Sequence, residues 1–303
     1  MKSQEIVNAI KAIFYSYQLG LESPYEIIIH RINKLFYGTK KALVIKKEKQ
    51  YKSLKEKYLK NNIWDFNGIK LPKWTKEFSQ ENLIIGTYLD ILLVYCNYND
   101  NYDSKLIDKL DLILPEGIYC YKNDEIDVTI KKGDVVIDAG AWIGDFSAYA
   151  SVKGAKVYAF EPSKNTVDYL EITQQMNGNI YIVEKGLGNK QEISYLKNDV
   201  YNSGANHVTI DAENAEKIEI TTIDDFVTEQ QLESVDFIKA DIEGFERYML
   251  QGAKKTLKKF APKLAICTYH LPDDPQVLAK IILDANSNYV IVQKKNKLYA
   301  AVK

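Results

Sequence analysis

The order of predicted strands and helices in the second half of the chain is the feature that most constrains its fold. From Gly117 onward, short runs of β-branched and aromatic residues alternate with helical stretches. This alternation is typical of β-α-β units, whose strands pair in parallel. The final two runs, Tyr289–Gln293 and Leu298–Val302, are joined by a short turn and predict an antiparallel hairpin. We therefore predict an α/β domain over residues 111–303, with a mostly parallel sheet, and a mainly helical region over residues 1–110.

The local pattern predicts the individual elements of this domain. Gly117–Tyr121 and Ile126–Ile130 predict a hairpin that precedes the sheet. The runs that predict strands of the sheet are Val135–Asp138, Ala155–Phe160, Ile180–Val183, Val235–Ala240 and Lys263–Thr268. The stretches that predict helices are Phe146–Val152, a segment from Ser163, one capped by Thr222, Phe245–Phe260 and Asp274–Ala285. Between Gly186 and Ile220, Gly and Asn favour loops and antiparallel strands over a crossover helix.

The N-terminal region is rich in lysine and tyrosine. Lys46–Lys60 places Tyr51, Leu54 and Tyr58 on one helical stripe. This pattern favours a solvated helix packed by its stripe, with a basic surface for an anionic partner as the alternative. Leu83–Cys96 predicts a buried core helix, because it is shorter than the ~20 apolar residues that span a bilayer. We expect the helices of this region to decide substrate choice or to form the contacts of a homo-oligomer.

Composition excludes several broad classes of protein. Hydrophobic residues make up 46% and charged residues 27% of the chain, as in soluble globular proteins rather than disordered chains. The formal net charge is -1, so no nucleic-acid partner is expected. Cys96, Cys120 and Cys267 form neither a CxxC pair nor an even-numbered framework, which predicts free thiols in a reducing compartment. The N-terminus lacks the features of a signal peptide, so we expect a cytoplasmic protein without a transmembrane segment.

A glycine-containing turn follows the first predicted strand of the sheet. Gly140 and Gly144 come after Asp138, at the place where doubly wound sheets bind ligands. A dinucleotide site needs glycine in the middle of this turn, and Trp142 stands there instead, which disfavours a pyrophosphate. Glu161 follows the next strand, where a carboxylate can accept hydrogen bonds from both hydroxyls of a ribose. The pattern favours an adenosyl ligand such as S-adenosylmethionine. The alternative is a tight turn without a ligand and an exposed loop acid.

Two carboxylates, Asp241 and Glu243, follow the fourth predicted strand of the sheet. With a strand period of two they would lie on the same side at the carboxyl edge of the sheet, where the cofactor must lie. One of them would then orient the cofactor or the acceptor nucleophile. The alternative is that Glu243 caps the following helix and Asp241 is the polar end of the strand.

Three stretches in fixed order carry a resemblance to a known family. VVIDAGAWIGDFS, VYAFEP and DFIKADIEGFE resemble the FkbM family of methyltransferases, and the Lys-x-Asp-Ile-Glu-Gly-x-Glu stretch is the most specific piece. The resemblance covers about Gly117–Val302. The chain departs from the family at Trp142, where relatives often have Asn, and at Cys267, where many have Glu.

This resemblance implies a Rossmann-like methyltransferase sheet, S-adenosylmethionine as cofactor, and methyl transfer to an oxygen. The acceptor it implies is a small molecule or glycan, commonly a sugar or a natural-product scaffold. The residues that we expect to bind the cofactor are Asp138, Gly140, Trp142, Gly144, Glu161 and Asp241.

His270 is the candidate general base. A sugar hydroxyl is a poor nucleophile at neutral pH, so a base or a metal must offset its proton. The ordinary pKa of histidine, ~6.5, leaves a neutral imidazole available. His270 follows the fifth strand, a neighbour of the fourth in this fold, so we predict that it acts in catalysis together with Asp241 and Glu243. The alternative for His270 is a structural or exposed loop residue.

The same three side chains can also hold a divalent cation, because they offer oxygen and imidazole ligands. On sequence grounds we assign no metal to the site. For His207 a place in a surface hairpin is favoured over one in the acceptor pocket, and His30 is expected to be structural.

Two other functions stay open at this point. A NAD-type oxidoreductase uses a similar sheet, although the missing middle glycine disfavours it. A non-catalytic binding or assembly module would use the Lys-rich N-terminal helices as its working part.

Overall fold

In the computed structural model the chain divides into two compact units. One comprises Met1–Phe66 and Lys73–Ile118, and the other comprises Asn67–Pro72 and Tyr119–Lys303. The residues that the structure describes are 45, 49, 52–66, 68–74, 119–197, 207–209, 213, 215–294 and 296–303. The division at residues 110 and 111 drawn from the sequence stays a prediction.

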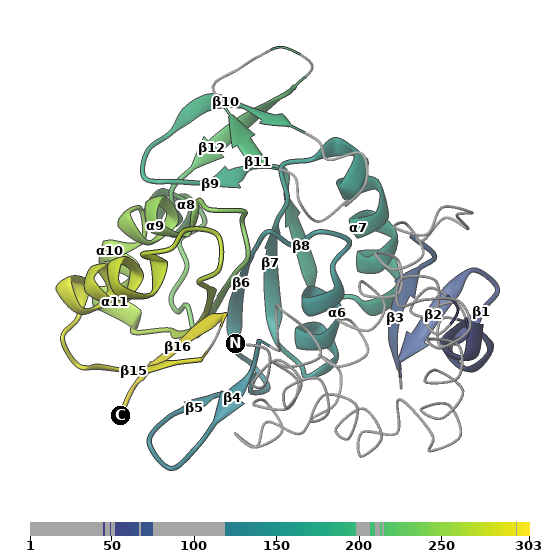
Figure 1. Ribbon diagram of the computed structural model, residues 1–303, viewed down its shortest axis with the longest axis horizontal. Helices are drawn as coiled ribbons and strands as arrows, with labels where there is room; N and C mark the ends of the chain where they lie inside the picture. Colours follow the sequence, from purple (N-terminus) through teal and green to yellow (C-terminus); the bar gives the residue numbers. More distant parts are fainter. Residues whose placement is uncertain are drawn as a thin grey trace. The chain divides into compact units, whose positions relative to one another are not determined.

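The larger unit is built on a seven-stranded sheet with the order β15-β16-β14-β13-β6-β7-β8 (Figure 1). Its strands are β6 (Val135–Ala139), β7 (Lys156–Phe160), β8 (Ile180–Val183), β13 (Phe237–Ala240), β14 (Lys263–Cys267), β15 (Tyr289–Gln293) and β16 (Lys297–Val302). Neighbouring strands from β14 to β8 pair in parallel. In contrast, β16 pairs antiparallel with β14 and β15. The predicted α/β class, mostly parallel sheet and antiparallel C-terminal hairpin are confirmed.

The strand order of this sheet reverses between β6 and β13. From β6 the chain first adds β7 and β8 on one side, and later β13 and β14 on the other. In open α/β sheets, ligands bind beyond the carboxyl ends of the strands at such a switch point. Because β6 ends at Ala139 and β13 at Ala240, the segments that follow these two residues form the expected ligand site.

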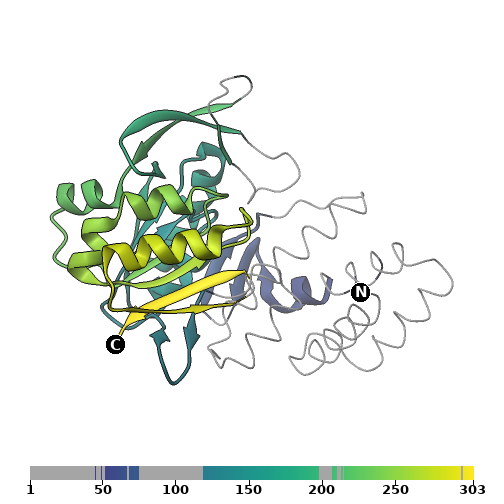
Figure 2. The same cartoon turned by 60° about the vertical axis from the view of Figure 1, so that its left-hand side comes forward.

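Helices cover both faces of this sheet (Figure 2). They are α6 (Asp145–Val152), α7 (Lys164–Asn177), α8 (Ile223–Glu229), α9 (Glu246–Gln251), α10 (Lys254–Phe260) and α11 (Asp274–Ala285). On one face, Ile137 and Ile238 join a buried core with apolar residues of α8 to α11. On the other, Phe146 of α6 packs against Phe237, with ring centroids 5.7 Å apart. Since side chains alternate along a strand, Asp138 belongs to the α6 face.

The helices largely follow their sequence patterns, with one correction. Helix α11 has the predicted bounds, and Thr222 caps α8 by accepting a hydrogen bond of 2.9 Å from the Asp225 backbone N–H. The predicted single helix Phe245–Phe260 is instead two helices, α9 and α10. The chain turns at Gly252, where a Cβ would lie 2.1 Å from the carbonyl oxygen of Gly188. The helix is therefore interrupted at Gly252, where the backbone of Gly188 comes close to the chain.

Between β8 and α8 the chain forms a second, smaller sheet, as predicted. Its strands are β9 (Gly186–Leu187), β10 (Glu192–Lys197), β11 (His207–Thr209) and β12 (Glu216–Thr221), in the order β11-β10-β12-β9. Strand β10 pairs antiparallel with both β11 and β12. His207 thus lies in a strand, and its side chain lies outside what the structure describes.

Two strand pairs and one short helix precede the main sheet. The predicted hairpin is present as β4 (Tyr121–Lys122) and β5 (Asp127–Val128), which pair antiparallel. Residues 52–58 are helical. The predicted helix Lys46–Lys60 ends earlier than expected, because β1 (Leu59–Lys60) pairs antiparallel with β2 (Ile63–Phe66).

The remaining early strand belongs to the larger unit. This strand is β3 (Ile69–Pro72), and it is tied to helix α7 through one asparagine. The backbone N–H of Lys70 donates to Asn177 Oδ1 at 3.1 Å, and Asn177 Nδ2 donates to the Lys70 carbonyl at 2.7 Å.

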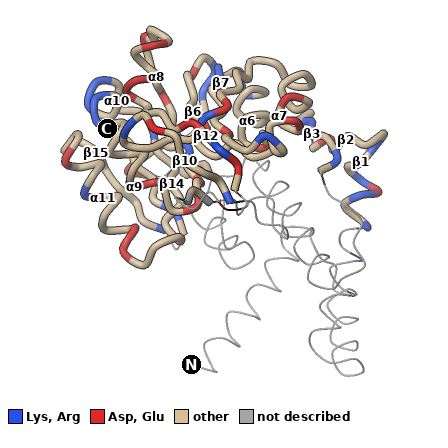
Figure 3. Tube along the Cα trace, turned by 90° about the horizontal axis from the view of Figure 1, so that it is seen from above, with Lys and Arg blue, Asp and Glu red and all other residues tan. Residues whose placement is uncertain are grey.

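Lys and Arg are interspersed with Asp and Glu over the described part of the chain (Figure 3). None of its helices is long and apolar enough to cross a membrane. Cys120 and Cys267 are buried, and the free thiols expected from the sequence stay a prediction. His30 and Leu83–Cys96 lie outside the described residues. The cytoplasmic location and a homo-oligomer formed through N-terminal helices stay predictions.

Candidate active site

The turn after β6 depends on two glycines in the left-handed backbone region. Gly140 has φ 74°, and a Cβ there would lie 2.0 Å from the backbone oxygen of Asp241. Gly144, with φ 85°, immediately precedes α6, and a Cβ there would lie 2.5 Å from Leu170 Cδ1 of α7. The first glycine lets the ends of β6 and β13 meet, and the second lets α7 pack against the turn.

Trp142 and Glu161 are joined through the backbone of the turn. Trp142 has φ 50°, and its backbone N–H donates to Glu161 Oε2 at 2.9 Å. The Ser163 N–H donates to Glu161 Oε1, also at 2.9 Å. Glu161 is only 7% exposed, and burial raises the pKa of its carboxyl to about 7 against the opposing effect of these two donors. The turn therefore fixes this carboxyl directly after β7.

Asp138 and Lys239 form a buried ion pair beneath the turn. They are register partners on β6 and β13, and Lys239 Nζ lies 3.0 Å from Asp138 Oδ1. Ser147 Oγ of α6 donates to Asp138 Oδ2 at 2.6 Å. Asp138 has no exposed surface, so both of its oxygens face protein groups. The direct cofactor contact expected for Asp138 stays a prediction, and the structure shows it anchoring Lys239.

Lys239 links this ion pair to the end of the turn. Its Nζ donates to the carbonyl oxygen of Gly140 at 2.5 Å. Burial alone would lower the pKa of Lys239, but the charges of Asp138, Asp241 and Asp145 outweigh it and raise that pKa. The side chain is thus a permanent cation that holds the ends of β6 and β13 together.

Asp241 is the first residue after β13 and is an ionised carboxylate. Tyr119 donates to its Oδ2 at 2.6 Å, and Tyr269 donates to its Oδ1 at 3.0 Å. Burial alone would raise the pKa of Asp241, but Lys239, Lys297 and His270, together with the Tyr119 hydrogen bond, lower it. Two hydroxyl donors and three nearby cations therefore keep this carboxylate charged.

Glu243 and Glu246 belong to the turn between β13 and α9. Glu243 has φ 53° and is followed by Gly244 with φ 97°, so this segment is a turn and no longer a strand. The alternative in which Glu243 caps the following helix is not observed, because Phe245 is the N-cap of α9 and no side chain caps this end. The oxygens of Glu246, the first residue of α9, instead accept hydrogen bonds from the Ile242 N–H at 2.8 Å and the Gly244 N–H at 3.1 Å in the turn. Glu246 is fully buried, whereas the Glu243 side chain is 24% exposed.

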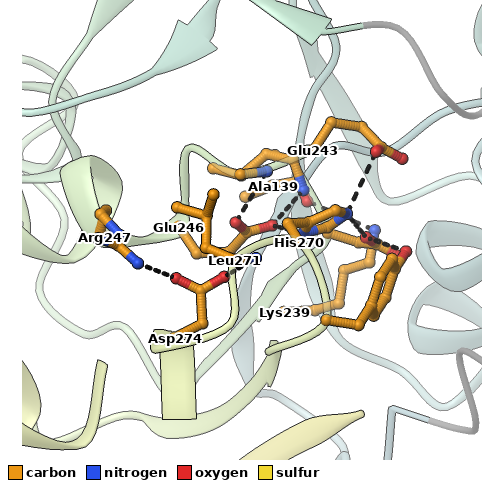
Figure 4. A network of polar contacts seen from close by, with 12 residues as sticks. Ala139, Lys239, Glu243, Glu246, Arg247, His270, Leu271 and Asp274 are labelled. Atoms are coloured by element: carbon orange, nitrogen blue, oxygen red, sulfur yellow. Dashed lines mark hydrogen bonds and ion pairs between the residues drawn. The ribbon is translucent and has the colours of Figure 1, made fainter. Parts of the chain in front are cut away.

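His270 lies among three carboxylates (Figure 4). Its Nε2 is 3.2 Å from Glu243 Oε2 and 3.7 Å from Asp241 Oδ1, and its Nδ1 is 3.1 Å from Glu246 Oε1. None of these contacts has the alignment of a hydrogen bond, so they are charge contacts among the described residues. Sequence analysis brought Asp241, Glu243 and His270 together correctly, and the structure adds Glu246.

The charge state of His270 corrects one expectation. Burial would lower the pKa of the imidazole, but the contacts with Glu243 and Glu246 and the charge of Asp241 raise it to about 10. These contacts favour the protonated imidazole at neutral pH, in contrast to the neutral imidazole expected from the sequence. A catalytic role for His270 stays a prediction, but it does not begin from a neutral base.

The loop that carries His270 is fixed to α9 and α11. The backbone N–H of Leu271 donates to Asp274 Oδ2 at 2.9 Å. Arg247 donates to Asp274 Oδ1 at 2.6 Å and to Asp273 Oδ1 at 2.9 Å. Neighbouring side chains thus determine where the imidazole lies (Figure 4).

Sequence reasoning missed several residues of this site. Lys239 and Glu246 were part of the quoted motif, but no role was assigned to them. Tyr119 reaches Asp241 across 122 residues of sequence, and no local pattern indicates that contact. Tyr269 directly precedes His270 and is 38% exposed beside the cluster.

Comparison with known proteins agrees with this arrangement. Residues 138–290 match the methyltransferase FkbM domain, and that span is half of the chain. The chain belongs to the FkbM methyltransferase family. The matched FkbM span contains Gly140, Glu161, the Asp241–Glu246 turn and His270, so it includes the whole cluster except Tyr119. The matched span, residues 138–290, is shorter than the span of about Gly117–Val302 over which the sequence motifs resemble the family.

Two curated relatives resemble part of this FkbM chain. The hexuronic acid methyltransferase AglP of Haloferax volcanii is 27% identical over 157 residues, which are 51% of the chain and 64% of AglP. A putative ribosomal RNA large subunit methyltransferase of Methanocaldococcus jannaschii is 24% identical over 162 residues, which are 53% of the chain and 37% of that protein. The chain thus spans less than two thirds of the length of either relative.

Two solved structures are also similar to this FkbM chain. The methyltransferase FkbM of Methylobacillus flagellatus has a TM-score of 0.47 and 20% identity, and the match covers 72% of this chain and 60% of that one. A putative methyltransferase of Streptococcus mutans, in complex with SAH, has a TM-score of 0.38 and 13% identity. That match covers 57% of this chain and 90% of the other.

Proposed function

We propose that the protein is an S-adenosylmethionine-dependent O-methyltransferase that acts on a sugar, a polysaccharide or a related hydroxyl acceptor. The observation that carries this proposal is the direct contact between two halves of a site. Gly140 in the turn after β6 touches the backbone of Asp241, from which the cluster of Glu243 and His270 continues. A cofactor held at the turn would therefore lie beside a cluster that can receive an acceptor.

The residues at the turn fit S-adenosylmethionine by the chemistry of their groups. Glu161 uses its two oxygens for one backbone donor each, which leaves lone pairs to accept hydrogen bonds from ribose hydroxyls. Asp241 is an ionised carboxylate at the same edge and suits a cofactor that carries positive charge. We propose Gly140, Trp142, Gly144, Glu161 and Asp241 as the cofactor site, with Asp138 placing the turn through Lys239.

The second half of the site would hold the acceptor. S-adenosylmethionine, when bound, supplies an electrophilic methyl group on a positively charged sulfur. The chain must then align the acceptor oxygen, exclude water and accept a hydrogen bond from the acceptor hydroxyl. Glu243 is the most exposed member of the cluster, so its carboxylate is our candidate for that hydrogen bond. His270, whose Nε2 lies 3.2 Å from Glu243, would orient this carboxylate.

A sugar acceptor is supported by one relative. AglP is a hexuronic acid methyltransferase by name, and the region shared with it, 51% of this chain, carries 27% identity. The mixed charge of the cluster suits a polar, hydroxyl-rich molecule better than an apolar one. We therefore place the acceptor among sugars and related hydroxyl compounds.

The proposal is tested first by ligand binding. Isothermal calorimetry of the full chain with S-adenosylhomocysteine and with NAD separates a methyltransferase from an oxidoreductase on a similar sheet. We expect S-adenosylhomocysteine to bind and NAD not to bind. Binding of NAD alone would contradict the proposal, and the absence of binding by either would favour a non-catalytic module.

A further inference from the structure

The cluster of Asp241, Glu243 and His270 has the composition and the spacing of a cation site. One ligand atom from each of the three lies within 4.8 Å of the others. The Nε2 distances of 3.2 Å to Glu243 and 3.7 Å to Asp241 would correspond to angles of roughly 100° and 125° at an ion bound by bonds of about 2.1 Å. Both angles lie in the ordinary range of metal coordination, so an ion fits without large movement.

The imidazole gives an observation that is independent of the carboxylates. The His270 side chain is only 9% exposed, and each ring nitrogen faces a carboxylate without the geometry of a hydrogen bond: Nε2 lies 3.2 Å from Glu243 and Nδ1 lies 3.1 Å from Glu246. Buried polar atoms without a hydrogen bond are rare, because each one costs free energy. Nε2 lies 3.7 Å from Asp241 Oδ1 and 3.2 Å from Glu243 Oε2, and a cation between these groups would replace the proton on Nε2 and bind its lone pair.

The residues that contact these three side chains are of the kinds that usually surround the ligands of a bound metal. Metal-binding histidines present their second nitrogen to a carboxylate, and metal-binding carboxylates are themselves hydrogen-bonded. His270 Nδ1 faces Glu246, which two backbone N–H groups hold in place. Asp241 accepts hydrogen bonds from Tyr119 and Tyr269. The carboxylate behind the imidazole and the hydrogen bonds to Asp241 are therefore both present, as in known metal sites.

We propose that Asp241, Glu243 and His270 bind a divalent cation that holds the acceptor oxygen. Three protein ligands leave coordination positions open for an acceptor and for water, as in catalytic rather than structural metal sites. Two carboxylate oxygens with one imidazole suit an ion of intermediate character such as Mn²⁺ better than ions that prefer oxygen or thiolate ligands only. This role rests on the proposed function, and a bound cation would make the acceptor hydroxyl more acidic.

Mn²⁺ binding to the full chain, followed by electron paramagnetic resonance, tests the site without any assay of activity. The signal of free Mn²⁺ falls when the ion binds protein, so titration gives stoichiometry and Kd directly. We expect one Mn²⁺ per chain and loss of that binding in His270→Ala and Glu243→Gln. Glu246→Gln, which alters the residue behind the imidazole, should weaken binding about 10–100-fold. Glu184→Gln changes an exposed carboxylate elsewhere and should leave it unchanged.

Two controls keep the outcomes distinct. Each variant is checked for binding of S-adenosylhomocysteine, and Glu243→Gln alters a partly exposed side chain, which limits damage to the fold. No bound Mn²⁺ at millimolar concentration, or equal binding by wild type and both ligand variants, overturns the cation site. If methyl transfer is nevertheless found, the proposed function stands alone. If Mn²⁺ binds as expected but no methyl transfer occurs, the proposed function fails and the cation site stands.

Discussion

At the scale of single residues, backbone shape and charge determine the site more than side-chain type does. Gly140 is required because two chain segments touch there, and Glu243 reaches the cluster because its backbone lies in the left-handed region. The carboxyl groups also differ in charge state. Asp241 is held ionised, whereas burial raises the pKa of Glu161 to about 7. The two carboxyl groups therefore differ in charge state although both lie at the same edge of the sheet.

Replacing Gly140 should show that close approach is the reason for this glycine. Gly140→Ala adds a Cβ that would lie 2.0 Å from a backbone oxygen, whereas Gly133→Ala has nothing within 4 Å at a similar φ. The positive φ alone costs about 1–2 kcal/mol. We expect this loss in Gly133→Ala and a clearly larger one in Gly140→Ala, measured by urea unfolding. Equal losses would show that the approach does not matter.

The charge of Glu161 predicts a pH dependence of cofactor binding. Ribose hydroxyls donate hydrogen bonds, so the ionised carboxyl is the better acceptor, and its pKa is about 7. Affinity for S-adenosylhomocysteine should therefore fall as the pH drops below 7, and Glu161→Gln should flatten this dependence. Calorimetry on either side of pH 7 measures it, and an unchanged profile in the variant would remove Glu161 from the cofactor site.

The same group predicts a pH dependence of stability with a defined sign. The pKa of Glu161 rises from 4.5 to about 7 on folding, so the folded protein keeps a proton that the unfolded chain releases. The contribution of Glu161 to stability is complete below pH 4.5 and is lost as the pH rises to about 7. Comparing the urea midpoints of wild type and Glu161→Gln across this range isolates that contribution. A difference between the two proteins that does not change with pH would contradict it.

His270 and Glu243 should affect turnover without affecting cofactor binding. Neither residue belongs to the turn after β6, so His270→Ala and Glu243→Gln should bind S-adenosylhomocysteine as wild type does. Loss of a group that handles the acceptor proton typically lowers the rate about 10²–10⁴-fold. Steady-state kinetics together with calorimetry check both statements. Loss of cofactor binding in either variant would reassign that residue to the cofactor half of the site.

At the scale of elements, the sheet brings together parts that are distant in the sequence. The buried pair of Lys239 and Asp138 joins β13 to β6, and Lys239 also holds the turn through the Gly140 carbonyl. The motif that contains Lys239 therefore has a structural role in addition to supplying Asp241 and Glu243. It fixes the strand end from which both halves of the site begin.

Removing Lys239 should destabilise the protein strongly, because buried carboxylates would lose their cation. Lys239→Met should cost about 3–5 kcal/mol in the free energy of unfolding, and adding Asp138→Asn should restore part of it. The exposed pair of Lys164 and Glu184 serves as a control, and Lys164→Met should have no measurable effect. Denaturant unfolding of wild type, Lys239→Met, Asp138→Asn and the double variant gives the coupling. Strictly additive losses would show that Lys239 and Asp138 do not act as a pair.

Sequence patterns predicted most elements and only part of the site, for physical reasons. Strand periodicity and helix caps act locally, so β8 and α11 were predicted with their observed bounds. The break at Gly252 was missed because it depends on the distant backbone of Gly188. Asp241 and Glu243 were placed together correctly, but a turn achieves this and not the strand period. The predicted neutral state of His270 differs from the structure because the three carboxylates that raise its pKa come together only after folding.

At the scale of the whole molecule, the seven-stranded sheet has the expected ligand site at its switch point. Membership in the FkbM family, the glycine turn and the acidic cluster agree on where a cofactor and an acceptor would meet. Tyr269, which is 38% exposed beside the cluster, is the side chain that we expect an acceptor to meet first.

Transfer of a labelled methyl group tests the central claim most directly. The full chain is incubated with S-adenosylmethionine labelled in its methyl group, together with fractionated glycans and nucleotide sugars, and the product is then treated with base. A methyl ether survives this treatment and a methyl ester does not. We predict base-stable label in a sugar fraction, strongly reduced in Glu243→Gln. Absence of label from every sugar fraction, or label that base removes, would contradict a hydroxyl-directed methyltransferase.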